Sequence, residues 1–363
     1  MNATTKGINA RFHLDWPGFT LDVDLTLPGR GVTALFGHSG SGKTSLLRCI
    51  AGLERPSLGA LTVNGEIWQD EQRRLPTHQR PLGYVFQEAS LFPHLTVLDN
   101  LRYGMKRSAA ARRVSLDQAI ALLGIGALLD RKPDRLSGGE KSRVGIARAL
   151  AVGPRLLLMD EPLSALDHDR KQEILPYLEH LHDELDIPVL YVSHAPDEVA
   201  RLADHLVVLQ DGKALAAGPL GETLARLDLP IKLGEDTGVV IDAIVAERDA
   251  PWHLVRVDFA GGGLWVRDGG HAIGQRVRVR ILARDVSLAH EKISHTSIQN
   301  MLPATVVAIA DDTHPALALV RLNIGQDGHS PLIARLTKRS AAQLELKPGM
   351  AIWAQIKAVA LIG

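Results

Sequence analysis

The chain has 363 residues, of which 45% are hydrophobic, and this size and composition predict two or three domains with full cores. Lys plus Arg and Asp plus Glu both number 41, so the net charge is zero, which argues against a protein that mainly binds nucleic acid or another polyanion. A single cysteine, Cys49, excludes a disulfide within the chain and fits a reducing compartment, and no run of about 18 apolar residues predicts a membrane span.

The N-terminal segment predicts a pair of strands. Ile8 to Leu27 alternates apolar and polar residues in part, and Pro28 to Gly31 is a turn sequence. Trp16 and Phe19 lie upstream of the motif described next, where either ring could stack on an adenine. Both are equally well explained as core or surface aromatics, so the sequence leaves the two interpretations open.

A phosphate-binding motif lies between a predicted strand and a predicted helix. Val32 to Phe36 is an apolar run typical of a buried parallel strand, and Ser45 to Ile50 predicts a helix closed by Gly52. Lys43 is expected to reach the β- and γ-phosphates of a nucleotide, and the Thr44 hydroxyl is expected to bind Mg²⁺. The residues between strand and helix fit G-x-x-x-x-G-K-[ST] and are Gly37, His38, Ser39, Gly40, Ser41, Gly42, Lys43 and Thr44.

Two short strands are predicted after this loop. Leu58 to Val63 is followed by Asn64-Gly65, which predicts a strand that ends in a hairpin turn. Leu82 to Gln87 predicts another strand, and Gln87 at its end could reach a metal ion or an attacking water. Polar residues commonly follow strands, so Gln87 alone is weak support for a site.

From Glu88 to about Leu150 the apolar spacing becomes helical. Leu136 to Glu140 leads into a predicted helix over Lys141 to Ala151. Anion binding is one interpretation of this helix start, and it would use Ser137, Gly138 and Gly139. An ordinary N-cap is the other, with Ser137 and Glu140 forming a capping box, and local physics alone favours the cap.

Carboxylates and a histidine follow two later strands. Leu156 to Met159 is apolar throughout, and Asp160 and Glu161 come directly after it, at the sheet edge where open α/β folds bind ligands. Asp160 suits Mg²⁺ coordination, and Glu161 suits activation of a water that attacks the γ-phosphate. Val189 to His194 predicts a further strand, although a lone histidine at a strand end is more often structural.

Beyond about Gly218 short β-rich runs replace the helical pattern. Leu254–Val257 resembles Leu319–Leu322, and Val277–Ile281 resembles Ile352–Ile356, which suggests an imperfect internal repeat. A helix over Ser340 to Leu346 is predicted in the second copy only. Two small OB-like barrel modules are the expected result, and chance similarity between β-rich segments is the alternative.

In this order the motifs resemble the ATP-binding cassette (ABC) family over about the first 225 residues. The matching segments are Gly37–Thr44 (Walker A), Gln87 (Q-loop), Leu136–Glu140 (signature), Leu156–Glu161 (Walker B), Ser164–Asp167 (D-loop) and His194 (switch histidine). The family usually has Gln where this chain has Glu140, although some importers carry Glu. The resemblance implies an α/β P-loop ATPase with a helical subdomain, in which Ser137, Gly138 and Gly139 bind the nucleotide of a second protomer.

The resemblance also implies roles for single residues. Glu161, His194 and Gln87 would be catalytic, and the Mg²⁺ ligands would be Thr44, Gln87 and Asp160. ATP and Mg²⁺ are the implied cofactors.

The C-terminal part resembles a Mop domain, the oxyanion-associated module of molybdate-binding proteins and molybdate importer ATPases. The resemblance rests on Thr296–Asn300, Ala334–Thr337, Leu346–Gly349 and Ala354–Ala358, and in the cassette half on Gly83–Gln87 and Leu101–Met105. The anion-pocket positions of Mop modules correspond to Ser297, Ser340 and Lys357. The Arg of the family pattern is Gln299 here, so an anion site and a purely structural module both remain open.

We therefore expect an ABC ATPase domain over residues 1–228 with a helical subdomain at about 88–150, a first β module and linker over 229–292, and a Mop/TOBE-like domain over 293–363. The resemblance implies an ATP hydrolase that drives import of molybdate, with tungstate as a second cargo. It implies a homodimer at the cytoplasmic face of the cell (inner) membrane, bound peripherally to two membrane-spanning permease subunits and served indirectly by an external molybdate-binding protein. No nucleic-acid partner is expected.

Three alternative functions are retained. An importer ATPase for sulfate, iron or sugar would share every cassette motif, and only the Mop resemblance disfavours it. A soluble ABC ATPase that acts on nucleic acid or ribosomes would be expected to have two cassettes or a basic excess. An oxyanion store or sensor would not need the intact Glu161 and His194.

Overall fold

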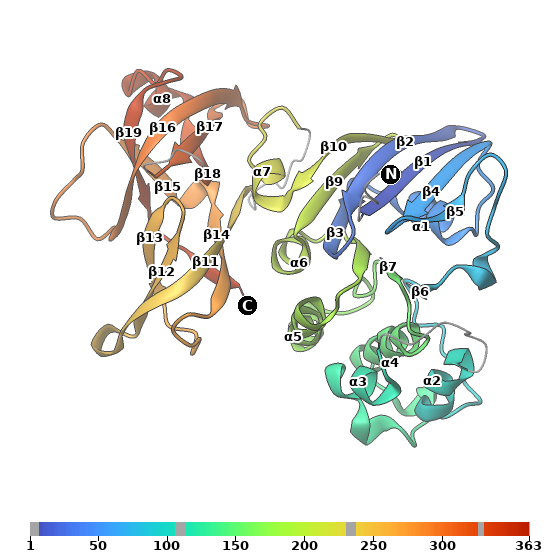
Figure 1. The fold of residues 1–363 in the computed structure, drawn as a ribbon. Coiled ribbons are helices and arrows are strands. Elements are labelled where there is room, and N and C mark those ends of the chain that lie inside the picture. Colours follow the sequence, from blue (N-terminus) through green and yellow to red (C-terminus); the bar gives the residue numbers. More distant parts are fainter. Residues whose placement is uncertain (1–6, 106–113, 230–236, 326–329, 363) are drawn as a thin grey trace. The chain divides into compact units, whose positions relative to one another are not determined.

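A computed structural model of the chain describes residues 7–105, 114–229, 237–325 and 330–362 (Figure 1). The chain divides into two compact units, residues 1–218 and 219–363. The helix α7 (Leu220–Leu224), inside the predicted first domain, contacts β11 (Gly238–Asp249) of the second unit. The three predicted domain ranges themselves stay a prediction. In the part of the chain that the structure describes, no helix has the length and apolar character that crossing a membrane requires.

The first unit is built on one mixed sheet, which among the described residues has ten strands in the spatial order β5-β4-β1-β2-β10-β9-β3-β8-β7-β6. The strands β9, β3, β8, β7 and β6 pair in parallel with one another in that order, and β7 and β8 are buried at every position, as their unbroken apolar sequences predict. The strand bounds are β1 Gly7–Trp16, β2 Phe19–Pro28, β3 Gly31–Phe36, β4 Leu58–Val63, β5 Glu66–Gln69, β6 Leu82–Val85, β7 Leu156–Asp160, β8 Pro188–Val192, β9 His205–Gln210 and β10 Lys213–Pro219.

The helices of this unit confirm the predicted α/β class. The helical region holds α2, α3 and α4, whose fully buried residues Leu101, Ala119 and Leu150 belong to one core with β7 and β8. The helix α4 begins three residues earlier than predicted because Ser137 caps it. The helix bounds are α1 Lys43–Ala51, α2 Val97–Met105, α3 Leu116–Leu122, α4 Gly138–Ala151, α5 His168–Glu184 and α6 Pro196–Leu202.

The second unit contains two curled five-stranded sheets among its described residues, in the orders β13-β12-β11-β14-β20 and β15-β19-β16-β17-β18. The predicted helix of the second copy is α8 (Lys338–Gln343), which also ends earlier than expected. It begins earlier because the Thr337 hydroxyl accepts a hydrogen bond from the Ser340 N–H at 3.0 Å and caps the helix. The remaining strand bounds are β12 Leu254–Phe259, β13 Gly262–Arg267, β14 Arg276–Leu282, β15 Val286–Ala289, β16 Asn300–Asp311, β17 Leu317–Ile324, β18 Ser330–Thr337, β19 Ala351–Ile356 and β20 Ala360–Ile362.

The internal repeat is visible in the topology. The order β13-β12-β11-β14 of one sheet matches β18-β17-β16-β19 of the other, and the long strands β11 and β16 each carry a register shift, after Val245 and after Val306. The fifth strand of each copy pairs in the other copy's sheet, because β15 joins β19 and β20 joins β14. Apolar side chains of the two sheets form one continuous core, so the two modules are structurally interdependent.

Candidate active site

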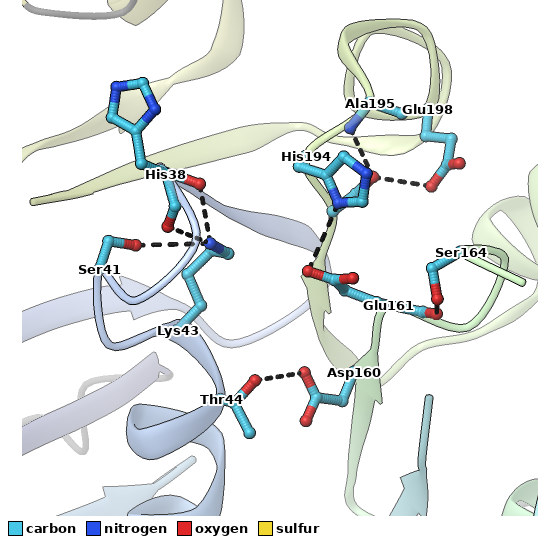
Figure 2. Close-up of polar contacts among 12 residues, drawn as sticks. His38, Ser41, Lys43, Thr44, Asp160, Glu161, Ser164, His194, Ala195 and Glu198 are labelled. Carbon is cyan, nitrogen blue, oxygen red and sulfur yellow. Dashed lines mark hydrogen bonds and ion pairs between the residues drawn. The ribbon is translucent and has the colours of Figure 1, made fainter. Parts of the chain in front are cut away.

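The phosphate loop connects the carboxyl end of β3 to α1 and has a shape that only glycine permits at two positions (Figure 2). Gly42 has φ of +102°, and a Cβ there would lie 2.9 Å from the Phe19 ring. A Cβ on Gly37 would lie 2.2 Å from the Leu209 carbonyl oxygen. The loop conformation therefore depends on these glycines, as the motif predicts.

Lys43 holds its ammonium group inside the loop. Its Nζ donates to the carbonyl oxygens of Gly37 at 2.7 Å and His38 at 2.8 Å, and to Ser41 Oγ at 3.4 Å (Figure 2). Burial lowers the pKa of Lys43, and the nearby carboxylates oppose that shift. The loop thus presents a buried cation beside the first turn of a helix, where anions bind well.

Asp160 ends β7 and faces Thr44 across the sheet edge. Its Oδ1 accepts from Thr44 Oγ1 at 2.9 Å, and its Oδ2 accepts from the Tyr84 hydroxyl at 3.1 Å. Burial raises the pKa of Asp160, and these two hydrogen bonds oppose the rise. A hydroxyl and a carboxylate at this spacing supply the hard oxygen ligands that Mg²⁺ prefers, so the residues fit a magnesium ion.

Glu161 and His194 lie together beside Asp160. Glu161 has φ of +46°, its N–H donates to the Val192 carbonyl at 3.1 Å, and its carbonyl accepts from Ser164 Oγ at 2.9 Å. These contacts direct its carboxylate to within 3.4 Å of His194 Nδ1 (Figure 2). The His194 side chain is 61% exposed and that of Glu161 is 23% exposed, so a reactant can reach both.

Other predicted residues lie on separate elements. Gln87 is exposed, two residues beyond the end of β6, and β6 pairs with β7 so that Val85 lies opposite Met159. Ser137 forms the capping box of α4, accepting from the Glu140 N–H at 3.2 Å while Glu140 Oε2 accepts from the Ser137 N–H at 2.7 Å. The cap interpretation is therefore confirmed, and the anion-binding role of Ser137, Gly138 and Gly139 stays a prediction.

The two aromatic candidates for adenine stacking lie at the turn between β1 and β2. The ring centroids of Trp16 and Phe19 are 6.2 Å apart, and the Phe19 ring approaches Gly42 of the phosphate loop. Trp16 is 39% exposed. Both interpretations of these rings therefore remain open.

The three candidate oxyanion residues are divided between the two ends of β16. Lys357 follows β19, whose Ile356 lies opposite Asn300 at the start of β16, and Ser297 shortly precedes that residue. Ser340 lies in α8 at the far end, where Lys338 forms an ion pair with Asp311 Oδ1 at 2.6 Å. Within one chain these residues therefore do not make a single pocket.

Sequence reasoning missed residues that support the site. Tyr84 bonds Asp160, and Glu198 bonds Ser193, which precedes His194. The available signals were a tyrosine within a short strand and a glutamate in the first turn of the helix after His194.

Comparisons with known proteins agree with this geometry. Residues 20–164 match the ABC transporter family model and residues 296–363 match the TOBE domain model. The chain is 71% identical over 357 residues to the molybdenum import ATP-binding protein ModC of Methylococcus capsulatus, covering 98% of this chain and 99% of that one. It is 72% identical over 362 residues to the ModC protein of Thiobacillus denitrificans, covering 99% of each. Among solved structures it is similar to cbiO1 of Clostridium perfringens, part of an ABC transporter complex, with a TM-score of 0.53 and 26% identity over 60% of this chain and 90% of that chain.

Proposed function

This chain belongs to the family of the molybdenum import ATP-binding proteins, which are ABC transporter ATPases, and on that premise we propose that it hydrolyses ATP to drive molybdate into the cell. The observation that carries the ATPase proposal is the meeting of Lys43, Thr44, Asp160, Glu161 and His194 at one edge of the parallel sheet. The relatives' names carry the choice of cargo. Tungstate would be a second cargo, since it is a tetrahedral dianion that resembles molybdate more closely than sulfate does.

Binding of ATP would use the phosphate loop. The backbone N–H groups of Gly37 to Thr44 and the start of α1 would surround the triphosphate, with the Lys43 ammonium as counter-charge. When bound, Mg²⁺ would neutralise phosphate charge, with the Thr44 hydroxyl, the Asp160 carboxylate and the Gln87 amide as its ligands.

Glu161 would act as the general base. Its carboxylate would accept a proton from the water that attacks the γ-phosphate, a role that typically accelerates a reaction by about 10²–10⁴-fold. The exposed ring of His194, 3.4 Å from that carboxylate, would donate a hydrogen bond to the γ-phosphate. Gln87 would join the same group when the site closes.

A second copy of the chain would complete the site. The N-terminus of α4, with Ser137, Gly138 and Gly139, would bind the γ-phosphate held in the other copy's phosphate loop, because helix N-termini favour anions. ATP would then join the two copies and hydrolysis would release them. Two permease subunits would hold this homodimer at the cytoplasmic face of the membrane and receive molybdate from an external binding protein.

For the C-terminal unit we propose oxyanion binding at two separate places. Ser297 and Lys357 would contribute to one, and Ser340, at the N-terminus of α8, to another. Calorimetry of the full-length protein with molybdate, tungstate and sulfate tests this. Heat from molybdate and tungstate but not from sulfate is the expected result, and Lys357→Ala should remove only the part of it that comes from the first place. No heat from any anion would make the unit purely structural.

Uptake of isotope-labelled molybdate tests the proposed function as a whole. Cells that lack the native gene would regain uptake when they express this chain, and would fail to do so with Lys43→Ala. Restored sulfate uptake without molybdate uptake would assign the chain to another importer. If the purified wild-type protein did not hydrolyse ATP, the ATPase proposal itself would be rejected.

A further inference from the structure

A buried glutamate lies next to the candidate site without belonging to it. Glu198 is in the first turn of α6, and its side chain is only 5% exposed. Its Oε2 accepts from the Tyr191 hydroxyl and from Ser193 Oγ, both at 2.8 Å, and its Oε1 accepts from Lys171 Nζ at 2.9 Å. A buried carboxylate is costly unless it is paired in this way, so these contacts fix its position.

Two of these partners belong to the strand and loop that carry His194. Tyr191 lies in β8, and Ser193 directly precedes His194. Besides donating to Glu198, Ser193 Oγ accepts from the Ala195 N–H at 3.0 Å (Figure 2). The Ser193 hydroxyl, just before His194, therefore bonds the backbone just after it, and the same hydroxyl donates to Glu198.

The third partner belongs to the segment that follows Glu161. Lys171 is in the first turn of α5, which begins directly after the N-cap residue Asp167. Ser164, earlier in the same segment, bonds the Glu161 carbonyl. Glu198 thus joins the loop of His194 to the chain that leads away from Glu161.

Burial also keeps the tyrosine a proton donor. The pKa of Tyr191 is raised well above its ordinary value, first by burial and then by the charge of Glu198. Its hydroxyl therefore stays protonated at any working pH.

We propose that Glu198 is a positioning residue for ATP hydrolysis, because its contacts with Tyr191, Ser193 and Lys171 fix the loop that sets His194 beside Glu161. The inference rests on the proposed function, since His194 matters only if the γ-phosphate reacts there. Glu198 touches no reactant, so its effect passes through His194. A shift of a catalytic group by about 1 Å can cost about 10²-fold in rate, so the loss of kcat on removing Glu198 should be of that order at most.

A double-mutant cycle of the full-length protein tests this. We expect Glu198→Ala to lower kcat for ATP hydrolysis by about 10- to 100-fold and to leave KM within about twofold. In a His194→Ala background the same substitution should lower kcat by less than about twofold further, because its route is already removed. Ser193→Ala should reproduce the kcat loss in part, and Glu198→Gln, which keeps an oxygen for the two hydroxyls, should recover part of it.

A matched control separates positioning from general stabilisation. Glu179 forms another ion pair between α5 and α6, with Arg201 in the last turn of α6 at 2.5 Å. Glu179→Gln should keep kcat even if it lowers the melting temperature. Equal losses of kcat from Glu198→Ala with and without His194 would overturn the proposal, and so would unchanged kcat in both Glu198→Ala and Ser193→Ala. An inactive wild-type protein would instead reject the proposed function on which the inference rests.

Discussion

Replacing Glu161 with Gln gives the sharpest test of the proposed chemistry. The substitution keeps the shape of a side chain whose backbone is held at φ of +46° and removes the carboxylate 3.4 Å from His194 Nδ1. A general base contributes about 10²–10⁴-fold, so kcat should fall by that factor, which corresponds to roughly 3–5 kcal/mol of activation free energy. ATP affinity should be kept or increased, because one negative charge close to Lys43 is removed.

Two measurements check this variant. Phosphate release at saturating ATP gives kcat, and size-exclusion chromatography with light scattering shows whether ATP now holds two copies together. Glu184→Gln, at the exposed end of α5, is the control and should behave as the wild type. Normal turnover in Glu161→Gln would refute the assignment of the base. Loss of ATP binding would show instead that Glu161 supports the nucleotide site.

Three further substitutions or treatments test the surroundings of the phosphate loop. Arg80→Met should lower the free energy of unfolding in urea by about 2–6 kcal/mol, because the buried guanidinium bonds the Cys49 and Ile50 carbonyls and each orphaned buried acceptor costs about 1–3 kcal/mol. A loss below about 1 kcal/mol would contradict this. Gly42→Ala should weaken ATP binding by about tenfold or more in a nucleotide titration, since left-handed backbone strain of about 1–3 kcal/mol adds to the clash with Phe19. Unchanged ATP affinity would refute this steric argument. Cys49 in α1 should resist alkylation at pH 8 until the protein unfolds, because burial raises the pKa of its thiol to about 12. Rapid alkylation of Cys49 in the native protein would show that α1 opens.

The candidate site was largely predictable because its chemistry follows fixed local rules. The phosphate loop requires glycine for steric reasons that hold in any sequence, as Gly37 and Gly42 show. Asp160 and Glu161 could be placed because a fully apolar strand of a parallel sheet ends at the edge where ligands bind. Pairing of neighbouring strands then brings His194 to the same edge, although nothing local to His194 predicts it.

The features that sequence reasoning missed depend on contacts between distant segments. The exchange of β15 and β20 involves strands of four and three residues, whose pairing is decided by the shared core and not by their own sequences. The start of α8 was misplaced because Thr337, the last residue of a strand, also serves as the cap. Glu198 looked like an ordinary acidic residue in a first helical turn, and only its three partners from separate positions show that it is buried.

The helix α4 contacts the segment that follows Glu161 in the same chain. Ser142 Oγ donates to the Pro162 carbonyl at 2.8 Å, one residue after Glu161, and Gly138 lies so close to Leu166 that a Cβ would be 3.0 Å from its methyl carbon. The start of α4, which we propose binds the nucleotide of a second copy, is therefore fixed to the segment that follows Glu161, the proposed general base. In the proposed dimer, a γ-phosphate bound at the start of α4 would therefore be connected through this segment to Glu161 of the same copy. Glycine at position 138 keeps this approach close, and a larger side chain would separate the two elements.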